Sequence, residues 1–408
     1  MNEKLALHGG PRAKSTPFNT PSRYGSEELK LVTEALQEGR LMGPGGKVED
    51  FERVAAEYYG VAHAVMVSSG TTAIHTALTA LGVAEGDEVL TTPMTDIGTV
   101  SAILAIHAIP TFTDIDLATR LVDPASLEER ITARTKAVIV VHMAGLPCSM
   151  DRVMAIASKR GLRVLEDCAQ SHGGRYGGRY LGTFGDAAAF SMNESKQVST
   201  GDGGFVLTDD GEVAGIAGQF RDKTYVRTGV PRGGQPIPFF ALNYRPTALQ
   251  AAVGIAQMGR LGESVARRDQ IVRRYYRELG DLPQLEFPEI CAGGEASWWP
   301  LPVRYTAGDP PRSELVEALA AEGIPIDTSM STVRNILRSE LFLKKRYYPL
   351  TDRIPSFWRD TEYDPDSCPN VDELGRTVFR LPVDPRYTDE DITQTVAAVR
   401  KVFRYYFG

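Results

Sequence analysis

Residues 137–141 read Ala-Val-Ile-Val-Val, an unbroken apolar run within a predicted strand over 137–142. A strand that does not alternate apolar and polar residues is typical of a mostly parallel sheet that helices cover on both faces. Similar strands are predicted at 64–67, 88–92, 111–115, 163–166, 187–191 and 204–208, and helices between them at 72–81, 99–108 and 151–160. The repeated strand–helix–strand units predict an α/β fold with a central sheet flanked by helices and right-handed crossovers.

The length of 408 residues exceeds what one compact core usually supports, so we expect two domains. Two N-terminal helices are predicted at 26–40 and 47–59. After residue 260 the strand–helix alternation ends, and the predicted elements are helices at 267–279, 313–322 and 388–406 and a strand at 299–305. We therefore predict a large α/β domain over residues 1–260 and a smaller C-terminal α+β domain over residues 261–408. The stretch 224–240 is predicted as a long loop.

Composition excludes several classes of partner. The net charge of −7 offers no cationic excess for a phosphate backbone, which argues against a nucleic-acid partner. The four cysteines form no CxxC pair and no metal-ligand spacing, so we expect no metal and a reducing, cytoplasmic location. Residues 1–17 lack the apolar core of a signal peptide, and no apolar run reaches the length of about 18 residues that spans a membrane.

A candidate phosphate site follows the strand at 64–67. Ser68, Ser69, Gly70, Thr71 and Thr72 lead into the next predicted helix. Glycine and small hydroxyl residues at a helix N-terminus present backbone N–H groups to an anion, and the helix dipole adds to the attraction. An ordinary capped helix start uses the same residue types, so the motif alone leaves both interpretations open.

An acid and a lysine are predicted at the same edge of the sheet. Asp167 follows the strand at 163–166, at the carboxyl edge where open α/β sheets bind ligands. Its carboxylate can pair with a protonated ring nitrogen, or it can cap a turn or join a salt bridge. Lys196 lies in a polar, glycine-rich loop after the strand that ends at Ser191. A lysine near other groups can lose its proton and bond to a carbonyl, although most lysines are solvated surface charges.

The three features together fit one cofactor. A phosphate site, a strand-end aspartate and a loop lysine occur in this order along the chain. Pyridoxal 5'-phosphate (PLP) needs an anchor for its phosphate, an acid for its ring nitrogen and an amine for its aldehyde. The sequence therefore predicts a PLP site, to which the Ser191 hydroxyl adds a phosphate contact.

These motifs resemble the DegT-type family of nucleotide-sugar and cyclitol aminotransferases, which are fold-type I PLP enzymes. The similarity runs nearly end to end and is most specific around Asp167 and Lys196. The stretches that carry it are 43–45, 48–51, 69–71, 86–89, 135–142, 166–173, 190–191, 196, 200–204, 243–245, 249–252, 368–370 and 381–383.

The resemblance implies roles for individual residues. Lys196 would bond to the cofactor and later move a proton, and Asp167 would pair with the ring nitrogen. Gln170 would lie beside the ring. The phosphate would be held by Gly70, Thr71, Thr72 and Ser191.

The resemblance also implies a homodimer with shared active sites. The family's asparagine that matches Asn243 reaches the phosphate bound to the partner subunit. Without the resemblance, Asn243 is a loop residue that caps a helix. Arg245 either holds a donor carboxylate or pairs with a surface acid.

The chain departs from the family pattern near the cofactor. Asp96 occupies the position of the aromatic residue that stacks on the ring. Its carboxylate would then change the ring electronics or meet a cationic substrate group; otherwise the loop is shifted and another side chain stacks. Glu194 is either a surface charge or a substrate contact. Segment 327–342 lacks a histidine that many relatives carry. These departures concern the acceptor substrate more than the cofactor.

The remaining candidates have structural interpretations. His142 ends a buried strand and no metal-ligand spacing surrounds it, which favours a hydrogen-bonded core histidine. Cys168 is expected in the core. Trp298 and Trp299 open a predicted strand and either pack in the core or line the cleft.

The predicted function is a PLP-dependent aminotransferase. It would move an amino group from an amino acid, glutamine or glutamate, to a keto-sugar nucleotide or keto-cyclitol in a biosynthetic pathway, as in antibiotic or surface-glycan synthesis. Two alternatives stay open. One is other PLP chemistry on the same scaffold, such as elimination, decarboxylation or ring formation. The other is a PLP- or sugar-binding protein without turnover.

Overall fold

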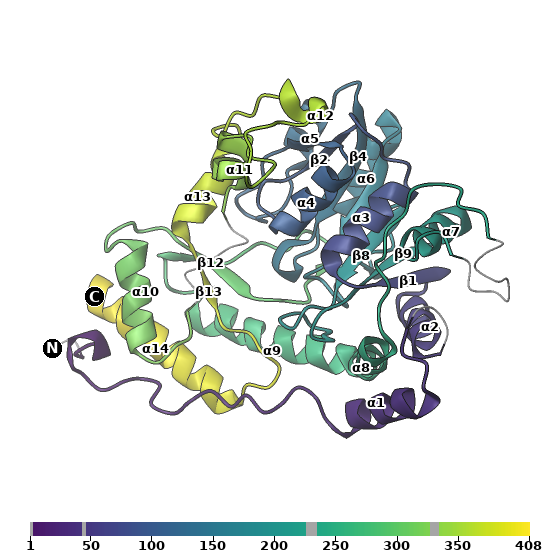
Figure 1. Cartoon of the computed structure of the whole chain (residues 1–408). Coiled ribbons are helices and arrows are strands. Elements are labelled where there is room, and N and C mark those ends of the chain that lie inside the picture. Colours follow the sequence, from purple (N-terminus) through teal and green to yellow (C-terminus); the bar gives the residue numbers. More distant parts are fainter. Residues whose placement is uncertain (1–2, 43–45, 226–234, 327–333) are drawn as a thin grey trace.

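The apolar run at 137–141 belongs to β4, an interior strand of a seven-stranded sheet (Figure 1). The computed structural model describes residues 3–42, 46–225, 235–326 and 334–408. The strand order is β1–β9–β8–β5–β4–β2–β3. The bounds are β1 His63–Val67, β2 Glu88–Thr91, β3 Ile109–Phe112, β4 Thr135–Val141, β5 Arg163–Asp167, β8 Ala187–Ser191 and β9 Gly204–Thr208. Strand β9 runs opposite to the other six strands of this sheet, so the predicted mostly parallel sheet is confirmed.

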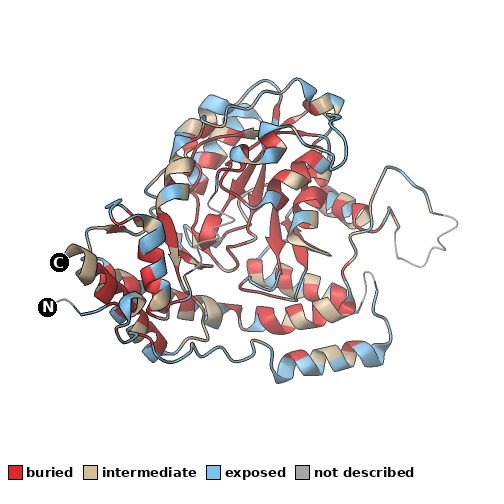
Figure 2. Ribbon diagram, turned by 60° about the vertical axis from the view of Figure 1, so that its left-hand side comes forward, coloured by how far each residue is buried: buried red, intermediate tan, exposed pale blue. Residues whose placement is uncertain are grey.

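Both faces of the sheet are buried, as the apolar strands require. In β8, Ala187 and Ala189 join one apolar cluster, whereas Ala188 and Phe190 join another, because alternate side chains point to opposite faces. The flanking helices are α3 Gly70–Ala80, α4 Ile97–Ala105, α5 Pro124–Arg130, α6 Met150–Arg160 and α7 Gly211–Phe220. Figure 2 shows buried residues concentrated in the sheet and on the inner faces of these helices.

A second group of elements follows the large sheet in the sequence. Helices α8 Ala248–Gly259 and α9 Leu261–Leu279 lead to a small antiparallel sheet of β10 Leu285–Glu286, β12 Leu301–Tyr305 and β13 Val378–Leu381. Its helices are α10 Arg312–Ala321, α11 Glu340–Leu343, α12 Ser356–Arg359, α13 Pro369–Thr377 and α14 Asp389–Phe407. This arrangement agrees with the expected α+β character of the C-terminal part.

The start of the chain packs against these C-terminal elements (Figure 1). The Lys14 ammonium contacts the Asp391 carboxylate at 2.7 Å, and both side chains are buried. The amide of Ala6 donates to the Glu322 carboxylate at 2.8 Å. The chain then continues into α1 Ser26–Glu38 and α2 Lys47–Tyr59 beside α8. The division into residues 1–260 and 261–408 stays a prediction, with the first segment in contact with the second.

Some predicted boundaries differ from the structure. Strand β3 begins at Ile109 instead of 111 and includes Pro110, which an edge strand tolerates because one side of its backbone needs no partner. Helix α9 begins at Leu261, six residues before the predicted start at 267. Residues 226–234 of the predicted loop, the motif at 43–45 and positions 327–333 lie outside the described residues.

The carboxyl ends of several strands meet at one edge of the sheet. Val67 of β1 pairs with Gly204 of β9, and Gly204 also pairs with Ser191 of β8. Asp167 ends β5, two strands from β9. The minor elements are a small sheet and three short helices, with the bounds β6 Arg175–Tyr176, β7 Arg179–Tyr180, β11 Gly294–Glu295, Ala6–His8, Met143–Gly145 and Ile336–Arg338.

Glu166 fixes this edge from the opposite face of β5. Its carboxylate accepts hydrogen bonds from the amides of Gly182, Phe184 and Gly185, at 2.7–2.9 Å, and one from His142 Nε2 at 3.1 Å. Burial by itself would raise the pKa of Glu166, but the bonds from His142 and the amides outweigh it and lower the pKa. The fully buried carboxylate thus ties β5 to the turn that precedes β8.

We predict that Glu166→Gln destabilises the protein by about 2–4 kcal/mol, because the amide NH₂ would face N–H donors. Because the pKa of Glu166 is lower in the folded than in the unfolded protein, its ionised carboxylate stabilises the fold at pH values above the unfolded-state pKa. This stabilisation is lost as the pH falls through the folded-state pKa. The difference in urea midpoint between wild type and variant should therefore shrink below about pH 4.5. The partly exposed acid Glu128, which forms a surface ion pair with Lys159, is a matched control, and Glu128→Gln should leave the midpoint nearly unchanged. Equal midpoints for wild type and Glu166→Gln would contradict the prediction.

Candidate active site

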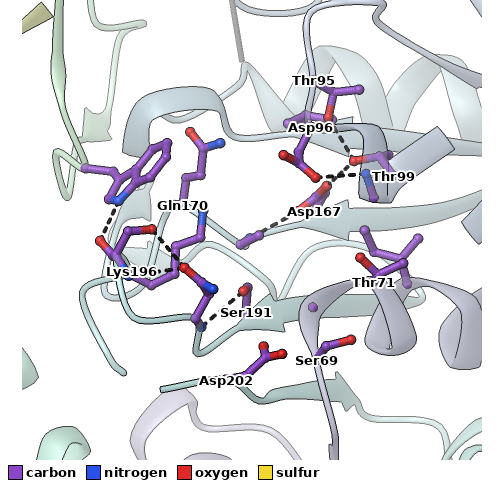
Figure 3. A pocket seen from close by; sticks show the side chains of 18 residues that line it. Ser69, Thr71, Thr95, Asp96, Thr99, Asp167, Gln170, Ser191, Lys196 and Asp202 are labelled. Atoms are coloured by element: carbon purple, nitrogen blue, oxygen red, sulfur yellow. Dashed lines mark hydrogen bonds between the residues drawn. The ribbon is translucent and has the colours of Figure 1, made fainter. Parts of the chain in front are cut away.

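A cavity of about 520 Å³ opens at the carboxyl edge of the large sheet. Figure 3 shows Lys196, Asp167, Gln170 and Ser191 pointing into the same space from the lysine loop, β5 and β8. Of the residues predicted to bind the cofactor, all except Thr72 and Asn243 line it, namely Gly70, Thr71, Asp96, Asp167, Gln170, Ser191 and Lys196.

The start of α3 forms one end of the cavity. Ala73 donates the first helical hydrogen bond to Ser69, so the amides of Gly70 and Thr71 precede the helix's own bonds. Gly70 is required here because a Cβ on it would lie 2.6 Å from Ser191 Cβ. The glycine lets the helix start approach the Ser191 hydroxyl, which leaves a cradle suited to a phosphate.

Thr72 serves the helix instead of the cavity. Its hydroxyl accepts from the Ser69 amide at 2.9 Å, and its own amide donates to Ser69 Oγ at 3.2 Å. This reciprocal pair is a capping box. The sequence left open whether these hydroxyls cap the helix or bind phosphate; in the structure Thr72 caps, and Ser69 both caps and lines the cavity.

Asp167 holds a buried carboxylate in the middle of the cavity. Thr99 Oγ1 donates to its Oδ2 at 2.9 Å, and the Ala169 amide donates to its Oδ1 at 3.1 Å. Thr99 is itself 2.8 Å from the Thr95 hydroxyl. Burial raises the pKa of Asp167, and these two hydrogen bonds counteract the rise. The carboxylate is therefore fixed in orientation and suited to receive a cationic N–H.

Lys196 faces this carboxylate from the loop between β8 and β9. Burial lowers the pKa of Lys196 to about 8, against the opposing effect of the carboxylates of Asp167 and Asp96. Its Nζ lies 3.9 Å from the centre of the Trp299 ring. A lysine with this pKa is partly unprotonated near neutral pH, which a nucleophilic amine requires.

Two side chains remote in sequence hold the lysine loop. Arg23 donates to the carbonyls of Glu194, Lys196 and Gln197 at 2.6–3.1 Å. Trp299 Nε1 donates to the Ser195 carbonyl at 2.6 Å. No local sequence signal identifies Arg23. For Trp299 the sequence allowed either packing in the core or lining the cleft, and in the structure Trp299 lines the cavity.

Gln170 and Asp96 are both held by backbone groups. Gln170 Oε1 accepts from the Ala144 amide at 2.8 Å. Asp96 caps α4, accepting from the Gly98 amide at 2.8 Å. Asp96 also lines the cavity. The residue at the family's aromatic position therefore belongs to the site, but it has no ring that could stack on a cofactor.

Asn243 lies outside the cavity of its own chain. It is exposed and forms a β-bridge with Asp222. The neighbouring Arg245 makes an ion pair with Asp222 at 2.5 Å, so it is paired with an acid, but this acid is buried and is not at the surface.

The His142, Glu166 and Cys168 cluster is a hydrogen-bonded part of the core. Its potential ligand atoms lie within 4.8 Å of one another. However, His142 Nδ1 accepts from the Cys148 amide at 3.2 Å, and its Nε2 contacts Glu166. Both ring nitrogens are therefore occupied, as expected of a core histidine.

The residues of the cavity fit PLP. A glycine-lined anion cradle, a buried carboxylate and an amine with a lowered pKa surround one space of suitable size. They correspond to the phosphate, the ring nitrogen and the aldehyde of the cofactor.

Among the described residues, no helix has the length and apolar character needed to cross a membrane.

Comparisons with known proteins agree with this fit. The model of the "DegT/DnrJ/EryC1/StrS aminotransferase family" matches residues 22–400. The spore coat polysaccharide biosynthesis protein SpsC of Bacillus subtilis is 34% identical over 95% of this chain and 97% of its own. GDP-perosamine synthase of Caulobacter vibrioides is 34% identical over 74% and 81%. A putative L-glutamine:3-amino-2,3-dideoxy-scyllo-inosose aminotransferase of Streptoalloteichus tenebrarius is 34% identical over 80% of each chain.

A solved structure has the same fold. The aminotransferase from Psychrobacter cryohalolentis superimposes with a TM-score of 0.85 at 29% sequence identity, covering 96% of this chain and 100% of that chain. This similarity confirms the predicted fold class.

We predict that the Lys196 amine in cofactor-free protein titrates near pH 8, well below the ordinary lysine value of about 10.4. Asp167→Asn should lower this midpoint further, because the carboxylate favours the ammonium form. The measurement is the pH dependence of cyanate labelling of the Lys196 peptide, read by mass spectrometry. The exposed Lys136 provides the reference rate. A midpoint above 10 in wild type, or an upward shift in Asp167→Asn, would refute the electrostatic argument.

Proposed function

Because this chain belongs to the DegT/DnrJ/EryC1/StrS aminotransferase family, we propose that it moves an amino group from glutamine or glutamate to the ketone of a sugar nucleotide or cyclitol. The protein is a PLP-dependent aminotransferase; the donor and the acceptor are the proposed part. Relatives that act on sugars and on a cyclitol support these acceptor classes. The observation that carries the proposal is the single cavity shared by Lys196, Asp167 and the α3 cradle.

The proposed roles of the residues are supported by their positions. Bound PLP supplies an electron sink and carries the amino group between the two substrates. The amides of Gly70 and Thr71 and the Ser191 hydroxyl hold its phosphate, and Asp167 keeps its ring nitrogen protonated. Lys196 Nζ takes and returns a proton, for which a pKa of about 8 is well matched to neutral pH.

The proposed assembly is a homodimer with shared sites. Apolar side chains are exposed on and beside α1: Leu29 at 72%, Leu36 at 54% and Met42 at 50%. Phe240, near Asn243, is 80% exposed. Exposed apolar surface of this kind is typical of a protein–protein interface, and Asn243 would then reach the cavity of the partner. Four free cysteines are compatible with the proposed cytoplasmic location.

We predict that borohydride reduction of the holoenzyme fixes PLP on Lys196, identified by the peptide mass. Lys196→Ala should lose this adduct and more than about 10³-fold in turnover, whereas Lys136→Ala should retain both. Glutamine labelled with ¹⁵N at its α-amino group should transfer the label to a keto-sugar nucleotide or keto-cyclitol. Loss of the label as ammonia would favour elimination, and an unchanged cofactor spectrum with every donor would favour a binding protein.

The shared site predicts complementation between inactive variants. Lys196→Ala and Asn243→Ala subunits should each be impaired, because one lacks the amine and the other lacks the phosphate contact. After unfolding and refolding together, hybrid dimers contain one site with both residues, which restores about a quarter of wild-type activity. Separate refolding of each variant is the control. No gain on mixing would place Asn243 outside the partner's site.

A further inference from the structure

Trp299 contacts the lysine loop in two ways. Its Nε1 donates to the Ser195 carbonyl at 2.6 Å, and its ring face lies 3.9 Å from Lys196 Nζ. Trp299 and Lys196 line the same cavity. We propose that Trp299 is a positioning residue for Lys196, whose ring holds the lysine amine whenever that amine is not bonded to the cofactor. This inference rests on the proposed function of Lys196.

The backbone around Trp299 keeps the indole in place. Its amide donates to the Ala144 carbonyl at 2.9 Å, and its carbonyl accepts from Arg268 at 3.1 Å. Trp298, just before it, is buried and has a φ of +49°, a conformation that a bulky residue adopts only when its surroundings require it. Strand β12 begins two residues later at Leu301. The ring is therefore a fixed platform built by the C-terminal part of the chain.

The charges around Lys196 explain why a platform is needed. The carboxylates of Asp167 and Asp96 attract its ammonium form, and Arg380 on β13 repels it. An amine released near a buried carboxylate would otherwise be drawn into an ion pair with Asp167. An indole face attracts the ammonium group, shields it from water and leaves the Asp167 oxygens available. The interaction is strongest for tryptophan among the aromatic side chains.

Arg23 provides a contrast within the same loop. It holds three carbonyls of the loop and is not among the residues that line the cavity. It therefore stabilises the loop as Trp299 does, but no ring lies against the amine. Variants of the two residues separate the effect of the ring from that of loop packing.

The experiment measures how well the free Lys196 amine is protected. Holoenzyme is first converted to its amino-loaded form with an amino donor, which is then removed. Cyanate labelling of the Lys196 peptide is followed by mass spectrometry, with exposed Lys136 as the reference. Trp299→Leu removes the ring, Trp299→Phe keeps a ring without the N–H, and Arg23→Gln loosens the loop. Trp299→Met and Trp299→Tyr form a second pair if the leucine variant does not fold. Single-turnover rates of both half-reactions are recorded in parallel.

Trp299→Leu should label Lys196 about three- to thirtyfold faster than wild type and slow both half-reactions, because a cation–π contact and its shielding are lost. Trp299→Phe and Arg23→Gln should label within about twofold of wild type, since each retains an aromatic face. Wild-type labelling in Trp299→Leu, or equally fast labelling in Trp299→Phe or Arg23→Gln, would overturn the inference. If borohydride fixes no cofactor on Lys196 of the wild type, the proposed function itself is wrong. This result differs from an unchanged labelling rate in Trp299→Leu, which contradicts only the role of Trp299.

Discussion

The site depends on placing a buried carboxylate and a buried amine around one cavity. Burial disfavours the charged form of each group, raising the pKa of Asp167 and lowering that of Lys196. The attraction between the two charges counteracts both shifts, lowering the pKa of Asp167 and raising that of Lys196. The sheet makes this possible because β5 and β8 are adjacent parallel strands whose carboxyl ends meet at one edge.

Consecutive residues of β5 divide structural and chemical tasks. Adjacent side chains of a strand point to opposite faces, so Glu166 and Asp167 cannot serve the same site. Glu166 binds three amides of the turn before β8, and Asp167 faces the cavity. The strand that carries the acid is thereby fixed to the segment that leads to the lysine. A shift of Asp167 by one residue would exchange these environments.

The sequence predicted what depends on local pattern and chain order. Apolar runs indicated the strands of the large sheet, and the order of the Gly70, Asp167 and Lys196 motifs indicated one cavity. It did not identify Arg23 or Thr99, and it did not decide whether Trp299 packs in the core or lines the cleft, since their contacts join segments far apart in the chain. Thr72 was assigned to the phosphate because a capping hydroxyl and an anion-binding hydroxyl look alike in sequence. The roles of the site residues, like the domain boundary at 260, stay predictions.

The charge of the cavity bears on the shared-site proposal. Among the described lining residues, Asp96, Asp167 and Asp202 carry carboxylates, and Lys196 is the sole cationic side chain. A phosphate group would add negative charge to a cavity in which acids already outnumber bases. The start of α3 offsets part of it through N–H groups and a dipole equivalent to roughly half a positive charge. Neutral donors from a second subunit, such as the Asn243 amide, would strengthen this end of the site without displacing the Lys196 pKa from the range that proton transfer requires.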